Sequence, residues 1–234
     1  GGLHYEGLSP YNYAIATNNT ALFDWLRSQN VPVDASGQKE PAPLQYAVQE
    51  GNAEFVRQLI EMGAMPKTET GTLVFSALCQ KKSGILAMLL EHGGNVNCIN
   101  TQWKNDPGIA YVVRFDRPKH FELLLQHKAD VNAKNDVGES ALSLAVRYRR
   151  VEMLQSLLLH NAHMGGKDAC DALTHAYEKQ WADIYIGLLN SKASPFEDTE
   201  TFSHFRTCIQ NAKDKGLIES LHAAEQRWNA TVRK

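Results

Sequence analysis

The sequence predicts an all-α protein, a solenoid of helix-turn-helix repeats, and three observations lead to this prediction. A similar phrase begins at six places along the chain, about 33 residues apart. Each copy contains two short stretches in which apolar residues recur at helical spacing. The second stretch usually ends at a Gly or Asn, which suits a left-handed helix C-cap. A chain of this kind forms a stack of similar units, so the main question is which partner it binds rather than which reaction it catalyses.

The first three repeats are predicted over residues 9–41, 42–71 and 72–106. The first combines S-P-Y-N-Y-A-I-A with A-L-F-D-W-L-R, and it places Trp25 at a core position of the second helix. The second combines P-L-Q-Y-A-V with F-V-R-Q-L-I. The third combines T-L-V-F-S-A-L with G-I-L-A-M-L-L. Each pair has an apolar face that it cannot bury alone, so neighbouring repeats must complete the core.

The last three repeats are predicted over residues 107–139, 140–170 and 171–197, which completes a repeat domain of residues 3–197. The fourth places three consecutive leucines beside Phe121. The fifth is the clearest copy, and its leucines at 154, 157 and 158 lie on one helical face. The first helices carry a small residue that allows close approach of their neighbours. These residues are Ala14, Ala47, Ala77, Ala145 and Ala176.

Helix ends and the C-terminal segment complete the predicted architecture. Gly or Asn ends the second helix in four repeats, whereas Lys128 and Lys192 depart from this pattern. The ends that follow it are Asn30, Gly63, Gly93 and Asn161. Residues 198–234 contain two apolar stripes, one through Phe205 and one ending at Trp228. They are predicted to form two capping helices with a polar outer face, because the end of a repeat stack must face water.

The repeat pattern resembles the ankyrin repeat family. The resemblance rests on six copies in phase, on the N-V-N and D-V-N phrases at 95–97 and 130–132, and on Gly51-Asn52, Gly63-Ala64 and Gly138-x-Ser140. It implies β-hairpin finger loops between the helix pairs and a protein-binding function. The His that the family usually has after Pro-Leu is replaced in every copy. The resemblance also raises β-hydroxylation of Asn97 and Asn132, although a structural role in the turns is the default.

Composition excludes several other classes of protein. The net charge is −2 and the pI about 6.5, which argues against a nucleic-acid binder. No apolar run approaches the roughly 18 residues that span a membrane, so no membrane partner is expected. The start of the chain has no signal-peptide pattern, and Gly1-Gly2 is treated as a cloning remnant. The four cysteines have no zinc-ligand spacing, which favours reduced thiols in the cytoplasm.

Motifs for catalysis are lacking, and we predict a non-enzymatic protein without metal or cofactor. One alternative is a nucleophilic pair formed by Cys170 and His175. Its position at a finger tip and helix start disfavours this reading. A second alternative is a metal-binding ladder of His92, His127 and His160, near the ends of successive second helices. The favoured interpretation is that these histidines complement the negative ends of the helices.

The resemblance places the partner on the finger tips and on the outward surface of the first helices. Positions five, eight and nine of each repeat are expected to face the partner, and they include Tyr46 in the second repeat and Leu144 in the fifth. Aromatic and Arg side chains, the types that dominate interface hot spots, gather in the fourth and fifth repeats. The candidate residues are Trp103, Tyr111, Arg114, Phe115, Arg147, Tyr148 and Tyr46.

The predicted ligand is a protein, or an acidic or phosphorylated peptide, on the concave face of the middle repeats. The basic run Arg147–Arg150, with Arg114 and Lys104 nearby, motivates the acidic or phosphorylated ligand. The protein is expected to be a monomeric scaffold. The alternative is the target-recruiting part of a larger protein, such as a bacterial effector in the cytoplasm of a host cell.

Overall fold

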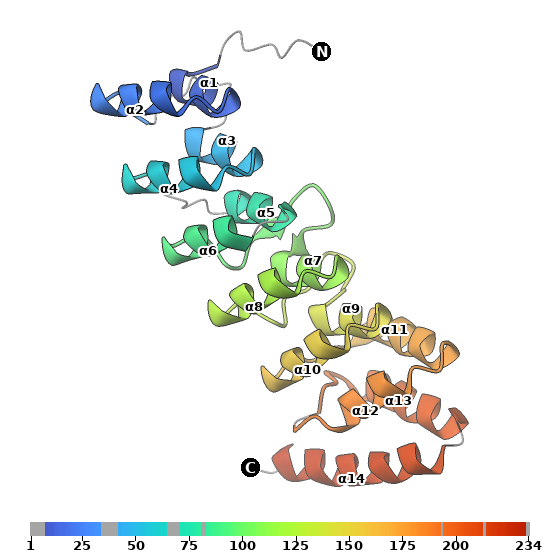
Figure 1. Cartoon of the computed structure of the whole chain (residues 1–234). Coiled ribbons are helices and arrows are strands. Elements are labelled where there is room, and N and C mark those ends of the chain that lie inside the picture. Colours follow the sequence, from blue (N-terminus) through green and yellow to red (C-terminus); the bar gives the residue numbers. More distant parts are fainter. Residues whose placement is uncertain are drawn as a thin grey trace. The chain divides into compact units, whose positions relative to one another are not determined.

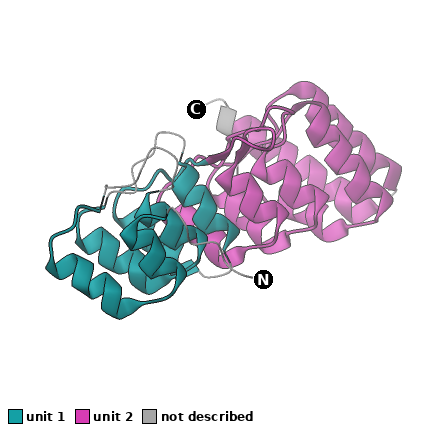
Figure 2. Ribbon diagram, turned by 90° about the horizontal axis from the view of Figure 1, so that it is seen from above, with its two compact units in different colours: residues 1–98 teal, residues 99–234 magenta. Residues whose placement is uncertain are grey.

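The computed structural model describes residues 8–33, 42–64, 71–80, 83–192, 194–212 and 214–232. Across these residues it contains fourteen helices and one two-stranded hairpin, so the all-α prediction is confirmed. The chain divides into two compact units, residues 1–98 and residues 99–234 (Figure 2). We call them unit 1 and unit 2 and describe each separately. No helix of the described residues is long and apolar enough to cross a membrane.

Unit 1 consists of three helical hairpins, stacked in chain order (Figure 1). Within it α1 contacts α3, α3 contacts α5, and α4 contacts α6, so first helices pack on first helices. The bounds are α1 Pro10–Ala16, α2 Thr20–Ser28, α3 Pro43–Gln49, α4 Ala53–Glu61, α5 Thr72–Cys79 and α6 Ser83–Glu91. Proline near the start of α1 and α3 suits a position whose backbone N–H has no partner in the helix.

Unit 2 continues the pattern with four more helical hairpins. The helices α7, α9, α11 and α13 contact one another in sequence, as do α10, α12 and α14. The bounds are β1 Ile99–Asn100, β2 Asp106–Pro107, α7 Gly108–Arg114, α8 Pro118–Gln126, α9 Ala141–Arg147, α10 Val151–Leu159, α11 Gly166–Glu178, α12 Ala182–Leu189, α13 Thr199–Ala212 and α14 Lys215–Val232. Helix α11 begins five residues before the predicted repeat start at Asp171.

Finger loops are present in unit 2. Strands β1 and β2 pair antiparallel, with Ile99 opposite Pro107, and Lys134 forms an antiparallel bridge with Ser140. At the next junction Met164 instead forms a parallel bridge with Phe196, so that junction has no hairpin of this kind. The predicted fingers at 34–41 and 65–70 lie outside the described residues.

The small residues of the first helices perform their predicted role. Ala14, Ala47, Ala77, Ala145 and Ala176 are all fully buried, which lets neighbouring helices approach closely. All four predicted Gly and Asn C-caps adopt the left-handed conformation. Lys128 has a φ of 62°, so the same turn forms there despite the lysine.

Two predicted orientations were tested by burial, and one is wrong. Trp228 is buried, and its indole Nε1–H donates to the Ser191 carbonyl at 3.2 Å, which confirms its structural role. Trp25 was expected in the core but is 57% exposed. The buried stripe of α2 is formed by Phe23 and Leu26, which turns position 25 toward solvent.

Candidate functional site

The first finger of unit 2 presents Trp103 at its turn. The Trp103 carbonyl accepts from the Asp106 N–H at 3.0 Å, and Lys104 and Asn105 adopt left-handed conformations. The neighbouring finger holds this turn, because the Lys104 carbonyl accepts from the Asp136 N–H at 2.9 Å. Trp103 is nevertheless 39% exposed. The finger therefore carries an aromatic side chain on a fixed backbone.

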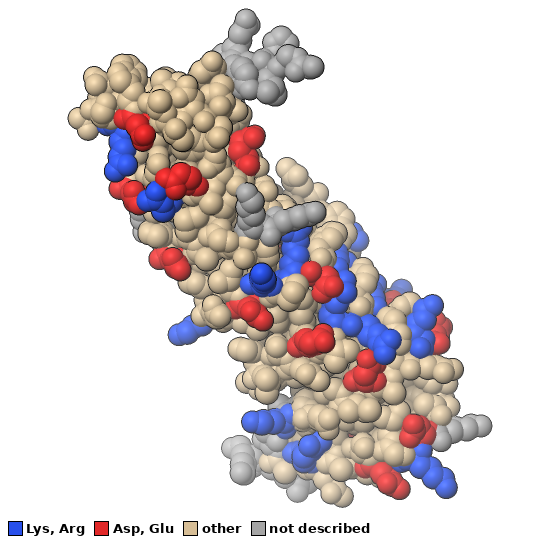
Figure 3. Space-filling model, in the orientation of Figure 1, with Lys and Arg blue, Asp and Glu red and all other residues tan. Residues whose placement is uncertain are grey.

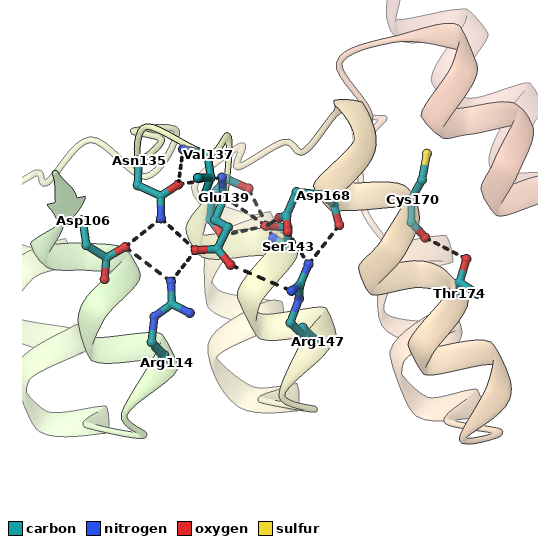
Figure 4. A network of polar contacts seen from close by, with 11 residues as sticks. Asp106, Arg114, Asn135, Val137, Glu139, Ser143, Arg147, Asp168, Cys170 and Thr174 are labelled. Atoms are coloured by element: carbon teal, nitrogen blue, oxygen red, sulfur yellow. Dashed lines mark hydrogen bonds and ion pairs between the residues drawn. The ribbon is translucent and has the colours of Figure 1, made fainter. Parts of the chain in front are cut away.

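Arg114 lies beside Trp103 and belongs to a buried polar network (Figure 4). Its guanidinium carbon is 4.5 Å from the centroid of the Trp103 ring. Its Nη2 donates to Glu139 Oε2 at 2.6 Å and to Asp106 Oδ1 at 3.4 Å. Asn135 Nδ2 donates to the same two carboxylates, at 2.7 and 3.2 Å. The network joins both fingers to the end of α7.

The pKa values of the two carboxylates in this network are shifted in opposite directions. Burial raises the pKa of Asp106, and the nearby Arg114 only partly offsets it. Burial also acts to raise the pKa of Glu139, but hydrogen bonds from Arg114 and Asn135 outweigh it and hold that pKa below its usual range. The difference follows from geometry, since Arg114 is closer to Glu139 and Asp106 Oδ2 has no hydrogen-bond partner.

Arg147 is paired in the same way, one repeat further along. It forms a short ion pair with Asp168, and Ser143 Oγ donates to the other oxygen of that carboxylate at 2.6 Å. Glu139 lies 3.9 Å from Arg147, so the two arginines share this carboxylate. Ser143 also completes a capping box with Ser140 at the start of α9.

The arginines that motivated an acidic or phosphorylated ligand are paired with carboxylates of the same chain. Arg149 pairs with Asp183 at 2.9 Å and Arg150 pairs with Asp116 at 2.9 Å, in addition to the pairs of Arg114 and Arg147. Each arginine is matched by a carboxylate from another repeat or from a finger. On the face shown in Figure 3, blue and red groups accordingly alternate over unit 2. The arginines are evident in the sequence, but the carboxylates that pair with them are not.

Two of the predicted aromatic residues of unit 2 are in contact with each other, and a third lies at the end of a neighbouring first helix. Tyr111 and Phe115 pack with ring centroids 4.6 Å apart, and Phe115 is still 53% exposed. Tyr148, at the end of α9, is 40% exposed. Tyr46 belongs to α3 of unit 1 and is half-buried. Leu144 was expected to face the partner but is fully buried, because it packs in the core side of α9.

The geometry gives little support to a nucleophilic pair of Cys170 and His175 or to a metal-binding ladder of histidines. Burial raises the pKa of the Cys170 thiol, which opposes formation of a nucleophilic thiolate. The His175 ring meets Trp181 edge-on at 5.4 Å, and Cys170 is 4.0 Å from Thr201 Oγ1. His92 and His160 each donate from Nδ1 to the carbonyl four residues earlier, at 2.8 Å. Asn132 Oδ1 accepts from the His163 N–H at 2.9 Å, a structural role in the turn.

Lowering the pH should decrease the free energy of unfolding of the native chain more than that of the variant Glu139→Gln. A carboxylate whose folded pKa is lowered contributes stability above its ordinary pKa of 4.5, and this contribution is lost as the pH falls through the folded value. We expect Glu139→Gln to lower the free energy of unfolding by about 2 kcal/mol at neutral pH. The difference should shrink toward zero below pH 4.5. Urea unfolding across this pH range measures it.

The exposed Glu122 of α8 provides the control for that prediction. Glu122→Gln should leave the free energy of unfolding within about 0.5 kcal/mol of the native value at every pH. A pH-independent loss in Glu139→Gln would show that its charge is not what stabilises the network.

Comparisons with known proteins agree on the type of repeat. The family described as Ankyrin repeats (3 copies) matches residues 11–100 and 77–168. The B-cell lymphoma 3 protein homolog of Mus musculus is 25% identical over 172 residues, which are 69% of this chain and 38% of that protein. The Ankyrin repeat and SOCS box protein 11 of Mus musculus is 31% identical over 122 residues, which are 51% of this chain and 36% of that protein. The chain thus spans under two fifths of these relatives.

A solved structure shares the fold. The ankyrin repeat domain of Bcl-3, a member of the IkappaB protein family, aligns with a TM-score of 0.59 and 24% identity. The match covers 79% of this chain and 86% of that structure. At this level of identity the likeness concerns the fold alone.

Proposed function

Because the chain belongs to the ankyrin-repeat family, we propose that it is a non-enzymatic protein-binding domain whose contact surface includes the fingers and first helices of unit 2. One observation carries this proposal. Trp103, Phe115 and Tyr148 are each at least 39% exposed, although large aromatic side chains are usually buried. We call these three side chains the aromatic surface. Exposed aromatic groups of this kind typically mark a site of protein contact.

The buried network gives the aromatic surface a fixed geometry. Trp103 lies on Arg114, and Arg114 is held by carboxylates of two fingers. An anchor that is already in place loses less conformational entropy when a partner binds. The arginines therefore support contact residues rather than bind an acidic group themselves. This arrangement favours a protein surface with apolar pockets over an acidic or phosphorylated peptide as the ligand.

Replacing Trp103 with alanine should weaken partner binding about 30-fold, the effect of a hot-spot aromatic worth roughly 2 kcal/mol. The partner is first captured by the whole chain and identified by mass spectrometry, and its affinity is then measured by surface plasmon resonance. Trp25→Ala is the matched control, because Trp25 is an exposed tryptophan on a second helix of unit 1. Equal affinities for the two variants would reject the aromatic surface as the binding site.

A second candidate is that these repeats recruit targets for a longer protein. The chain spans only 38% and 36% of the two relatives, and one of these is named for a SOCS box as well as for ankyrin repeats. Under this proposal the full gene product contains a further domain, and the captured target binds the repeats alone as tightly as it binds the whole product. Sequencing the complete transcript and comparing the two affinities tests it.

A further inference from the structure

A cavity of about 540 Å³ opens on the first-helix side of unit 2, next to Tyr148. Its lining comes from three helices: Arg147 and Tyr148 at the end of α9, Asp171 and His175 one turn apart on α11, and Trp181 at the start of α12. Three of these five side chains are aromatic rings. Trp181 and His175 meet edge-on with centroids 5.4 Å apart, so two of the rings support each other.

The charges around this cavity do not cancel. Arg147 is paired with Asp168, and Arg149, whose guanidinium carbon lies 5.7 Å from the Trp181 ring centroid, is paired with Asp183. Asp171 is exposed and forms no hydrogen bond or ion pair with another described residue. Lys167 of α11 and Lys179, the residue that follows this helix, do not line the cavity. The cavity therefore carries one uncompensated negative charge beside its aromatic rings.

Aromatic faces and a carboxylate together favour a positively charged guest. The face of an indole attracts a cation through its quadrupole, more strongly than other aromatic rings. Trp181 already does this within the chain, since the Arg149 guanidinium carbon is 5.7 Å from its ring centroid. An acidic guest would meet Asp171 with like charge, and an apolar guest would leave that carboxylate desolvated and unpaired.

We infer that this cavity receives a lysine or arginine side chain of the partner protein, with Asp171 as its counter-ion. The inference rests on the proposed function and specifies the chemistry of the partner, which is basic rather than acidic. Tyr148 belongs both to this cavity and to the aromatic surface, so one bound segment can contact both. The exposed Glu178 of α11 lines an adjacent cavity together with Trp181.

The test uses a random peptide library displayed on phage, selected against the whole chain. Enriched peptides are synthesised, and their affinities are measured by fluorescence anisotropy. We expect the enriched peptides to share one lysine or arginine, whose replacement by norleucine or citrulline lowers affinity about tenfold. Asp171→Asn should cause a similar loss and should then make that replacement nearly neutral. Because Asp171 is exposed and unpaired, the variant should unfold at the native urea concentration.

Glu152→Gln is the matched control, because Glu152 is an exposed carboxylate of α10 that lines none of the cavities of α9, α11 and α12 described above. It should retain native affinity. Enriched peptides that bind Asp171→Asn as tightly as the native chain would overturn the inference while leaving the proposed function intact. A library from which the native chain selects no peptide, or only peptides insensitive to both Asp171→Asn and Trp103→Ala, would count against both.

Discussion

Replacing Arg114 with alanine is expected to lower the free energy of unfolding of unit 2 by about 3–5 kcal/mol. The side chain of Arg114 is only 10% exposed, and its partners Asp106 and Glu139 are 0% and 11% exposed. Without the guanidinium, two carboxylates remain buried close together with Asn135 as their shared donor. Such a variant loses an ion pair and also retains uncompensated charge, which is why the expected loss far exceeds that of a surface pair.

Tryptophan fluorescence can isolate the response of unit 2. Trp25 is the single tryptophan of residues 1–98, so a Trp25→Phe background leaves only reporters in unit 2. In this background, urea unfolding of Arg114→Ala is compared with that of Arg149→Ala. Arg149 and Asp183 form a pair whose side chains are 51% and 36% exposed, so its loss should cost less than about 1 kcal/mol. Equal losses in the two variants would contradict the role assigned to the buried network.

Replacing Phe205 with alanine is expected to cost about 3–5 kcal/mol, the usual range for a buried phenylalanine. Phe205 is fully buried in α13, where its ring stacks on Tyr185 at 5.6 Å and packs on Phe196 at 4.7 Å. These contacts join the capping helices to α12 and to the bridge at Met164. In a repeat stack the loss of a terminal contact first releases the terminal helices, because each repeat is held mainly by its neighbours.

Phe202 offers a comparison of the same residue type in the same helix. It is only half-buried and lines an open cavity with Trp228 and Asn229. Phe202→Ala should therefore cost clearly less than Phe205→Ala. Hydrogen exchange should show loss of protection in α13 and α14 for Phe205→Ala before it spreads to α11. Uniform loss of protection across unit 2 would show that these helices unfold together with the repeats and do not act as a separable cap.

Trp103 is involved both in the stability of unit 2 and in the proposed binding surface. Because its ring lies on the Arg114 guanidinium, Arg114→Ala removes the support of the proposed anchor as well as the pairing of the carboxylates. A binding experiment with an arginine variant consequently cannot tell whether the arginine contacts the partner or only holds Trp103 in place. This is why Trp103→Ala, with Trp25→Ala as its control, provides the sharper test of the binding surface.

Most of the fold could be predicted from the sequence because it depends on local and periodic features. Helical spacing of Leu154 and Leu157, small residues such as Ala145, and C-caps such as Gly63 and Asn161 act within one repeat or between neighbours. Each of these signals occurs several times in phase, so the fold can be predicted even where one copy is weak. Trp25 was misplaced for the converse reason, since a single amphipathic helix with mixed apolar residues does not define which of them faces inward.

The site was less predictable because it depends on pairs of residues far apart in the chain. Arg114 contacts Glu139 25 residues later, and Arg149 contacts Asp183 34 residues later. The available signal was a set of arginines at or just after the ends of first helices, with acidic residues 21 to 34 positions away in neighbouring fingers or repeats. Such a signal indicates that charges can meet, but it does not show which carboxylate is near enough to bind.

Repetition every 33 residues or so was sufficient to predict the class of fold, the stacking of helical hairpins and the presence of aromatic residues on the fingers and first helices, because it constrains all of these together. The charge of the surface follows only from the packed structure. Whether an arginine faces a partner or a carboxylate of its own chain depends on side-chain distances of a few ångströms across repeats. Among the described residues Arg114, Arg147, Arg149 and Arg150 are paired with carboxylates, whereas Asp171 forms no ion pair.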